Sequence, residues 1–425
     1  MANTYEPVGA HFAPRRGVKG APCAAAFVGV AVVVALALFV GSGGNVETGT
    51  GLAEGAAGFA NRIGKQLATV PYAAQLATVP CATQRGRNPY AIDASSLETL
   101  EFFAIGDWGL DTEYNKEDGP RDDWDVPLMQ HIGQTLNARI EEGQGSFVLN
   151  LGDNFYQWGI SDVEDVRWET TFENVFATRR VVPWYSMLGN HDYFANIGVD
   201  NKPTSAGIDA QVDRTFHSAN KRWCMPDTNY TILHATAHVD VRIVVFDSQA
   251  LVRISPNANS PAYDTRASPD IEDHLAWLER AVCAEGRKGR KTIVMTAAHH
   301  FFLSAGLYFD RARQDEAILR ERVLPVLTRC GVSMHFHGHD HVTQVIRIDK
   351  SLLQVGVGSA GKKNGMILGT QDSLSKMYPE HQLQTYFLDQ QAAFAQVQIS
   401  KDSVSLRLIN TSGDAWGPMV ASHID

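Results

Sequence analysis

Four short blocks of the chain combine glycine with side chains that bind metals. A single Gly-Asp or Gly-His pair carries no information, because turns are rich in such pairs. Here four blocks mix carboxylate and carboxamide oxygens with imidazole nitrogens, a set that suits iron, manganese or zinc better than calcium. This pattern predicts a two-metal phosphoesterase site. The blocks are Gly106-Asp107-Trp108-Gly109, Gly152-Asp153-Asn154-Phe155-Tyr156, Gly189-Asn190-His191-Asp192 and Gly338-His339-Asp340-His341.

Short apolar segments precede these blocks and must position them. We predict strands over residues 97–105, 146–151, 181–188 and 332–336, each running into one block, and a fifth over 291–297 that leads to His299 and His300. Helical patterns lie between them, over 127–142, 161–176, 269–285 and 311–328. Ser161 and Glu164 have the spacing of a capping box. Because strands and helices alternate, we expect largely parallel or mixed sheets with helices outside.

With these motifs in this order, the chain resembles the small, single-domain animal type of purple acid phosphatase, within the calcineurin-like metallophosphoesterases. The resemblance spans residues 99 to 412 and includes Lys221-Arg222-Trp223-Cys224-Met225-Pro226 and residues 394–400. It implies an α/β (α+β) fold, a four-layer α/β/β/α sandwich of two mixed sheets flanked by helices. In such folds ligands bind beyond the carboxyl ends of the strands, where every motif lies.

The resemblance also implies a ferric site. Asp107, Tyr156 and His341 would bind Fe(III), and Asp153 would bridge that ion to a second, divalent metal. A phenolate is a strong ligand for ferric iron and a poor one for magnesium, and the violet colour of the family comes from that pair.

The divalent ion, which would be Fe, Zn or Mn, is assigned Asn190, His299 and His339 by the same resemblance. His191 would lie outside both ligand sets, near the leaving-group oxygen, as a general acid. Asp192 would orient it or cap the turn.

Two neighbouring histidines compete for one ligand position. His299 and His300 would point to opposite faces of a strand end, so at most one reaches the metal. We assign His299, because the ligand of the family follows two small residues, here Ala297 and Ala298. Where some relatives have a second substrate-facing histidine, nine residues further on, this chain has Tyr308.

The predicted activity follows from the metals. Two ions about 3.5–4 Å apart can hold an attacking hydroxide and the charge that develops on the ester. A trivalent ion lets hydroxide persist at acidic pH. We therefore predict an acid phosphatase that hydrolyses phosphate monoesters, small molecules or phosphoproteins, by direct attack of a metal-bound hydroxide at an Fe(III)-M(II) centre. The alternatives are a phosphodiesterase or nucleotide hydrolase of the same superfamily, and a membrane-anchored scaffold with a vestigial phosphatase fold.

The formal charge of −10 and the lack of a basic block exclude nucleic acid as a partner.

The N-terminal quarter predicts membrane attachment. Residues 1–22 are basic and would form a cytoplasmic tail; residues 23–41 are apolar, near the ~20 residues that span a bilayer. They form either a signal anchor or, with small residues at 41–43, a cleaved signal peptide. We predict that residues 42–98 form a flexible low-complexity stalk and that residues 99–425 form the catalytic domain. We expect a single-pass type II membrane protein with a lumenal or extracellular catalytic domain, or alternatively a secreted one.

Export makes two further features meaningful. Asn229 and Asn410 begin glycosylation sequons, so a glycoprotein is expected. Four cysteines beyond the apolar segment allow three disulfide pairings, among which the sequence does not choose: Cys81, Cys224, Cys283 and Cys330.

One segment imitates a phosphate-binding loop. Gly356-x4-Gly361-Lys362 has nearly the right spacing, but Lys363 stands where a metal-binding Ser or Thr is required. We interpret it as a glycine-rich wall of the active site.

Overall fold

A computed structural model describes residues 91–92, 97–110, 124–156, 159–196, 206–217, 222–252, 271–309, 316–362 and 365–423. The predicted tail, anchor and most of the stalk, residues 1–90, lie outside these ranges, so the domain boundaries there stay predictions. In the described part of the chain no helix combines the length and the apolar character needed to cross a bilayer.

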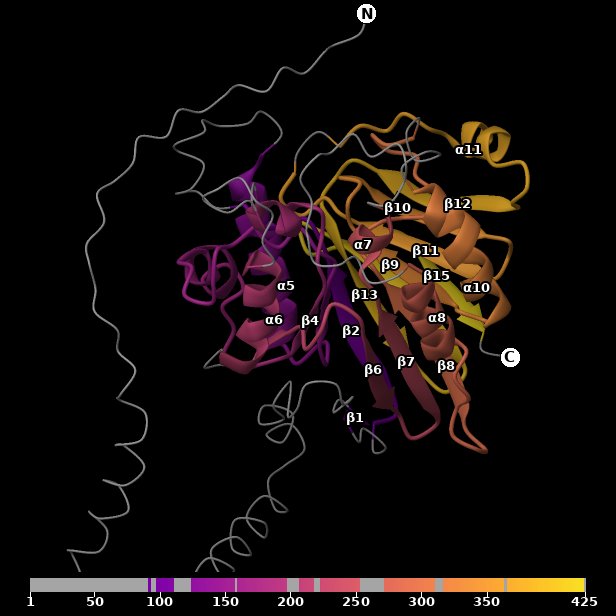
Figure 1. Cartoon of the computed structure of the whole chain (residues 1–425), viewed down its shortest axis with the longest axis horizontal. Helices are drawn as coiled ribbons and strands as arrows, with labels where there is room; N and C mark the ends of the chain where they lie inside the picture. Colours follow the sequence, from indigo (N-terminus) through magenta and orange to yellow (C-terminus); the bar gives the residue numbers. More distant parts are fainter. Residues whose placement is uncertain are drawn as a thin grey trace, which may run out of the picture. The chain divides into compact units, whose positions relative to one another are not determined.

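Two mixed sheets form the centre of the fold (Figure 1). The eight-stranded sheet has the order β1 (Ala91–Ile92), β6 (Tyr230–Ala235), β7 (Val239–Val245), β8 (Lys291–Ala297), β9 (Met334–His337), β11 (Leu352–Val357), β10 (Thr343–Ile348), β12 (Leu383–Asp389). The seven-stranded sheet has the order β15 (Ala415–His423), β14 (Ser403–Asn410), β13 (Ala393–Ile399), β2 (Leu100–Ile105), β3 (Val148–Asn150), β4 (Trp184–Ser186), β5 (Trp223–Cys224).

In each sheet a central run of strands is parallel. β2, β3, β4 and β5 pair in parallel in one sheet, as do β7, β8, β9 and β11 in the other. Apolar side chains of both sheets meet between them; the rings of Phe102 on β2 and Phe336 on β9 lie 5.7 Å apart. The parallel runs therefore bring several carboxyl strand ends together, as the motifs require.

Helices cover the outer faces (Figure 1). α5 (Val126–Glu141) and α6 (Ala206–His217) lie on the side of the seven-stranded sheet, and α8 (Ile271–Val282) and α10 (Leu324–Arg329) on the side of the eight-stranded sheet. Two short helices, α7 (Ser248–Val252) and α11 (Gln371–Met377), follow β7 and precede β12. The predicted sandwich of two mixed sheets flanked by helices is confirmed.

One predicted helix is wrong. Residues 161–166 form bends and turns, and only a short helical segment, chiefly the π-helical η1 (Trp168–Glu173), lies in the range 161–176. Ser161 makes no capping box with Glu164, because its hydroxyl donates to the carboxylates of Asp162 and Asp165. Short polar side chains here satisfy the backbone locally and compete with helix formation.

The region of the last predicted helix is described from residue 316 onward. There the chain forms η3 (Leu319–Val323), a π-helical turn, which continues into α10. A disulfide joins Cys283, after α8, to Cys330, after α10, with a Cα–Cα distance of 5.0 Å. It selects one of the pairings that the sequence left open and ties two outer helices together.

Candidate metal centre

The predicted site residues follow the carboxyl ends of five strands. Three of them, Asp107, Asp153 and His339, have positive φ angles of 59°, 52° and 65°. Such angles are strained for non-glycine residues and concentrate at functional sites. Glycines of the motifs permit close packing, since a Cβ on Gly338, before His339, would lie 2.1 Å from Asp107 Oδ2 and one on Gly189, before Asn190, would lie 2.2 Å from Asp153 Oδ1.

Three residues surround the hydroxyl of Tyr156. Tyr156 Oη donates to Asp153 Oδ2 at 2.8 Å and lies 3.2 Å from Asp107 Oδ1. His341 Nε2 is 3.4 Å from the same hydroxyl and 3.5 Å from Asp107 Oδ1. The structure thus brings together the residues predicted for the ferric site and the predicted bridging carboxylate.

A second group adjoins the first through Asp153. Asn190 Oδ1 lies 3.1 Å from His299 Nε2 and 2.8 Å from His339 Nδ1. His299 Nε2 is 3.4 Å from Asp153 Oδ1, while its Nδ1 donates to the carbonyl of Leu151 at 2.8 Å. That bond directs Nε2 of His299 toward the other candidate ligands.

The site is deeply buried, and burial and neighbouring charges change the pKa values of its acidic side chains. Asp107, Asp153, Tyr156 and His299 are at most 1% exposed. Burial, with the nearby charge of Asp153, holds the pKa of Asp107 well above its ordinary value. Burial also raises the pKa of Asp153, but the charges of His299 and His191 outweigh it and lower that pKa to about 2. Ligand atoms of Asp107, Asp153 and His299 lie within 4.8 Å of one another, close enough to hold one cation.

Tyr156 and His339 keep their neutral forms in the protein alone. Burial and the two carboxylates raise the pKa of Tyr156 well above 10. Burial and the charge of His299 lower the pKa of His339 well below its ordinary range. Two acids, a phenol and several imidazoles converging in a buried site are a donor set that a highly charged cation satisfies.

His191 and Asp192 follow Asn190 directly. The imidazole of His191 is half-buried, its centroid 4.5 Å from that of Tyr156, and its backbone N–H donates to Asp153 Oδ1 at 2.9 Å. Asp192 is fully buried and accepts from the backbone N–H groups of Asn154 and Gly189 at 3.0 and 2.8 Å. Burial, with the charge of Asp153, raises its pKa to about 8. Asp192 therefore fixes the loops that carry the candidate ligands.

Two residues beside the centre were predicted to be neither ligands nor catalytic groups. Lys362 is 4% exposed, and its Nζ lies 4.4 Å from the ring centroid of Tyr156 and 5.2 Å from that of Trp124. Tyr308 stacks on His339, with centroids 4.5 Å apart and planes at 19°. The sequence analysis placed Lys362 in a glycine-rich wall of the active site but gave its ammonium group no role.

His300 lies beside the site and not in it. Its Nδ1 is 2.9 Å from Ser248 Oγ, and its ring centroid is 4.3 Å from that of His339. Burial lowers its pKa well below the ordinary value, so it stays neutral. His300 packs against the ring of the candidate ligand His339.

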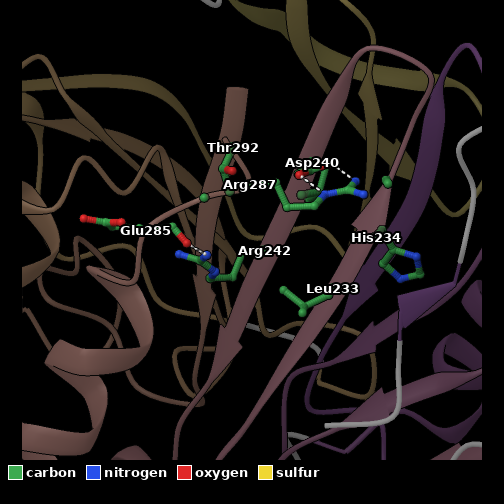
Figure 2. Close-up of a pocket in the computed structure, with 10 residues that line it drawn as sticks. Leu233, His234, Asp240, Arg242, Glu285, Arg287 and Thr292 are labelled. Atoms are coloured by element: carbon green, nitrogen blue, oxygen red, sulfur yellow. Dashed lines mark hydrogen bonds and ion pairs between the residues drawn. The ribbon is translucent and has the colours of Figure 1, made fainter. Parts of the chain in front are cut away.

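A separate cavity lies at the opposite ends of β7 and β8 (Figure 2). It measures about 450 Å³ and is lined by Leu233, Asp240, Arg242 and Arg287, among others. Asp240 accepts from Arg287 and, at 2.8 Å, from Arg290, while Arg242 donates to the carbonyls of Ala284 and Glu285. None of the predicted site residues lines it.

Comparisons with known proteins agree with this geometry. A sequence profile of the calcineurin-like phosphoesterase family matches residues 100–343. The chain is 25% identical to human tartrate-resistant acid phosphatase type 5 over 321 residues, which covers 74% of this chain and 88% of that protein. It is 28% identical to Arabidopsis thaliana purple acid phosphatase 17 over 277 residues, with 64% and 70% covered.

Two solved structures share the fold. The Plasmodium protein GAP50, described as the anchor in the inner membrane complex, aligns with a TM-score of 0.58 at 18% identity over 77% of this chain and 89% of that one. Purple acid phosphatase PPD1 from yellow lupin aligns with a TM-score of 0.52 at 14% identity, covering 79% and 55%. The resemblance inferred from the motifs is confirmed, and the chain belongs to the calcineurin-like phosphoesterase family.

Proposed function

We propose that this phosphoesterase is an acid phosphatase that hydrolyses phosphate monoesters at a binuclear metal centre. One observation carries the proposal: seven candidate ligands from five strand ends form two adjoining groups that share Asp153. Catalytic phosphoesterase activity accounts for this buried concentration of acids better than a structural role does, because such a set destabilises the protein unless cations compensate it.

The residues fit the implied metals. Asp107, Tyr156 and His341 would hold a ferric ion, because a buried phenol with a raised pKa becomes a ligand only beside a highly charged cation. Asn190, His299 and His339 would hold Fe, Zn or Mn as the divalent ion, and Asp153 would serve both. When bound, the two ions would supply a nucleophilic water of lowered pKa and positive charge to balance the phosphate.

The other residues of the centre act on the substrate or on the ligands. His191, half-buried beside Tyr156, would donate a proton to the leaving-group oxygen. Asp192 would keep the loops of Asp153 and His191 in register through its backbone hydrogen bonds. The ammonium of Lys362 would favour the phenolate form of Tyr156, because a cation interacts more strongly with an electron-rich ring.

The test is metal analysis of the purified protein, followed by visible spectroscopy and assays. We expect iron with a second metal, a visible absorption band that Tyr156→Phe abolishes without unfolding, and faster turnover of monoesters than of diesters. A colourless, fully loaded and active wild type would mean a different metal pair. Preference for diesters would favour the phosphodiesterase or nucleotide hydrolase, and absence of bound metal would favour the scaffold.

We also propose that residues 23–41 anchor the enzyme in a membrane, with a stalk over 42–98. Support comes from the apolar composition of the segment and the basic residues before it. Expressed in a secretory system, the full chain should resist carbonate extraction and carry glycan on Asn229 or Asn410. Recovery of a soluble form that begins near Ser42 would show a cleaved signal peptide instead.

A further inference from the structure

We propose that the substrates of this centre carry an apolar alcohol, and that Leu307, Met366 and Leu368 bind it. We call these three residues the apolar rim. The inference rests on the proposed function and narrows it to one substrate class: phosphate monoesters of extended alkyl or aryl alcohols.

Exposed apolar side chains are concentrated at one place. Among the residues that the structure describes, four large apolar side chains are exposed, and three of them form the rim: Leu307 at 42%, Met366 at 50% and Leu368 at 44%. The fourth, Val166, lies on the turn before η1. A single exposed apolar residue needs no explanation, but a cluster marks a binding surface.

The rim belongs to two segments that are joined to each other. The backbone N–H groups of Leu368 and Gly369 donate to the carbonyl of Ala305 at 3.0 and 2.9 Å. Gly369 packs so closely on Phe309 that a Cβ there would lie 2.6 Å from the ring. Residues 305–309 and 365–369 therefore form one continuous surface despite their separation in the sequence.

This surface borders the metal centre. The N–H of Leu307 donates to Asp340 Oδ1 at 3.1 Å, and the next residue, Tyr308, stacks on His339. Gly365, next to Met366, lies against His341, where a Cβ would come 1.9 Å from the carbonyl oxygen. Asp340 stands between the two candidate ligands, so both segments of the rim flank the fourth motif.

The composition of the two segments disfavours a polar alcohol. Residues 301–309 read Phe-Phe-Leu-Ser-Ala-Gly-Leu-Tyr-Phe and residues 365–369 read Gly-Met-Ile-Leu-Gly, without a single charged side chain. A sugar or nucleotide placed here would lose water and gain few hydrogen bonds, which is unfavourable. An alkyl or aryl group would gain from burial, and the metals would hold the phosphate.

The experiment measures binding of n-alkyl phosphonates, from methyl to octyl, by calorimetry. Phosphonates carry the charged head of a monoester but cannot be hydrolysed. The samples are the metal-loaded full-length protein, the triple variant Leu307→Ser, Met366→Ser, Leu368→Ser, the single variant Met366→Ser and the control Val166→Ser. Thermal unfolding checks that each variant is folded; inorganic phosphate reports the metal centre alone.

For wild type and Val166→Ser we expect Kd to fall about two- to fourfold for each methylene that the rim covers. In the triple variant Kd should be nearly independent of chain length, and Met366→Ser should lie between. Inorganic phosphate should bind all four proteins equally.

Three results overturn the inference, and the third also overturns the proposed function. If phosphate binds but the Kd of wild type does not depend on chain length, the rim does not bind the alkyl chain, and the proposed function stands. If the triple variant keeps the wild-type dependence, the alkyl chain lies elsewhere. Failure of phosphate and all phosphonates to bind the wild type would overturn the proposed function, and the rim with it.

Discussion

The metal centre and the cavity of Figure 2 hold their acids in opposite ways. In the cavity Asp240 faces Arg287 and Arg290, whose side chains are 63% and 27% exposed, and their hydrogen bonds, that of Arg287 first, lower its pKa. In the centre Asp107 lies beside another acid, Asp153, and burial raises its pKa. An acid paired with arginines near solvent is satisfied by the protein itself, whereas acids buried together need a cation from outside.

The sharpest test of this contrast removes the shared acid. Asp153→Ala should lose metal and reduce activity by more than the about 10²–10⁴-fold typical of a lost general acid, because both groups depend on this carboxylate. The metal-free variant should be less stable than the metal-free wild type, since the lowered pKa of Asp153 means that the folded protein stabilises this carboxylate, and its loss leaves Tyr156 Oη and the N–H of His191 without their acceptor. Metal content by plasma mass spectrometry and thermal unfolding measure both effects. Full metal occupancy would contradict the assignment.

The next largest effect concerns proton donation. His191→Ala should keep its metals and bind phosphate, but hydrolyse alkyl esters about 10²–10⁴-fold more slowly. Nitrophenyl phosphate, whose leaving group needs no proton, should be affected far less. Loss of metal in this variant would make His191 a ligand; equal losses on both esters would make it a residue that positions the substrate.

A buried histidine outside the metal centre, His234, makes the stability of the protein depend on pH. His234 is 3% exposed, stacks on Phe147 at 4.6 Å and, within the described residues, has no hydrogen-bond partner for either ring nitrogen. Burial lowers its pKa to about 3 from the ordinary 6.5. Between these values the unfolded chain binds a proton that the folded protein does not, so stability is lost as pH falls below about 6.5.

His234→Phe should remove that loss. The wild type should lose up to ~2 kcal/mol of unfolding free energy between pH 7.5 and pH 5 that the variant keeps, because at pH 5 the histidine of the unfolded chain is mostly charged. Urea unfolding at the two pH values measures the difference. Parallel pH dependences of variant and wild type would show that His234 is protonated or solvated in the folded state.

A smaller effect is expected from replacing Lys362, whose ammonium group lies over the ring of Tyr156. Lys362→Met should weaken iron binding by about tenfold, in the range of residues that support a ligand, and shift the visible band to longer wavelength because the phenolate is less stabilised. Lys362→Arg should preserve both properties. An unchanged band and affinity in Lys362→Met would show that the ammonium serves packing only.

The smallest effect should come from the cavity. Asp240→Asn removes a charge whose arginine partners are partly exposed to solvent, so it should reduce stability by about 1 kcal/mol or less and leave metal content and activity unchanged. Denaturant unfolding and the phosphatase assay test this. A loss of metal here would mean that the two regions are coupled and would break the comparison.

Much of the scaffold could be predicted because its signals are local. The strands β2, β3, β4, β8 and β9 and the helices α5 and α8 occur within a few residues of the predicted ranges, since each has its own apolar pattern. The convergence of the motifs also follows locally, because each motif directly follows a strand. The helix predicted over 161–176 does not form, because the carboxylates of Asp162 and Asp165 accept hydrogen bonds from backbone N–H groups there. A pattern of apolar residues does not reveal such competing hydrogen bonds.

The sequence by itself therefore determined the fold class, the family and the residues that could bind metal, because these depend on residue types next to strand ends. Only the tertiary structure decided which distant segments meet there. Lys362 lies over the ring of Tyr156, Tyr308 stacks on His339, and the segments that carry the three rim residues are joined at the carbonyl of Ala305. Cys283 finds Cys330 in the same way. Contacts of this kind depend on how the sheets and their loops pack, and no local pattern of residues encodes them.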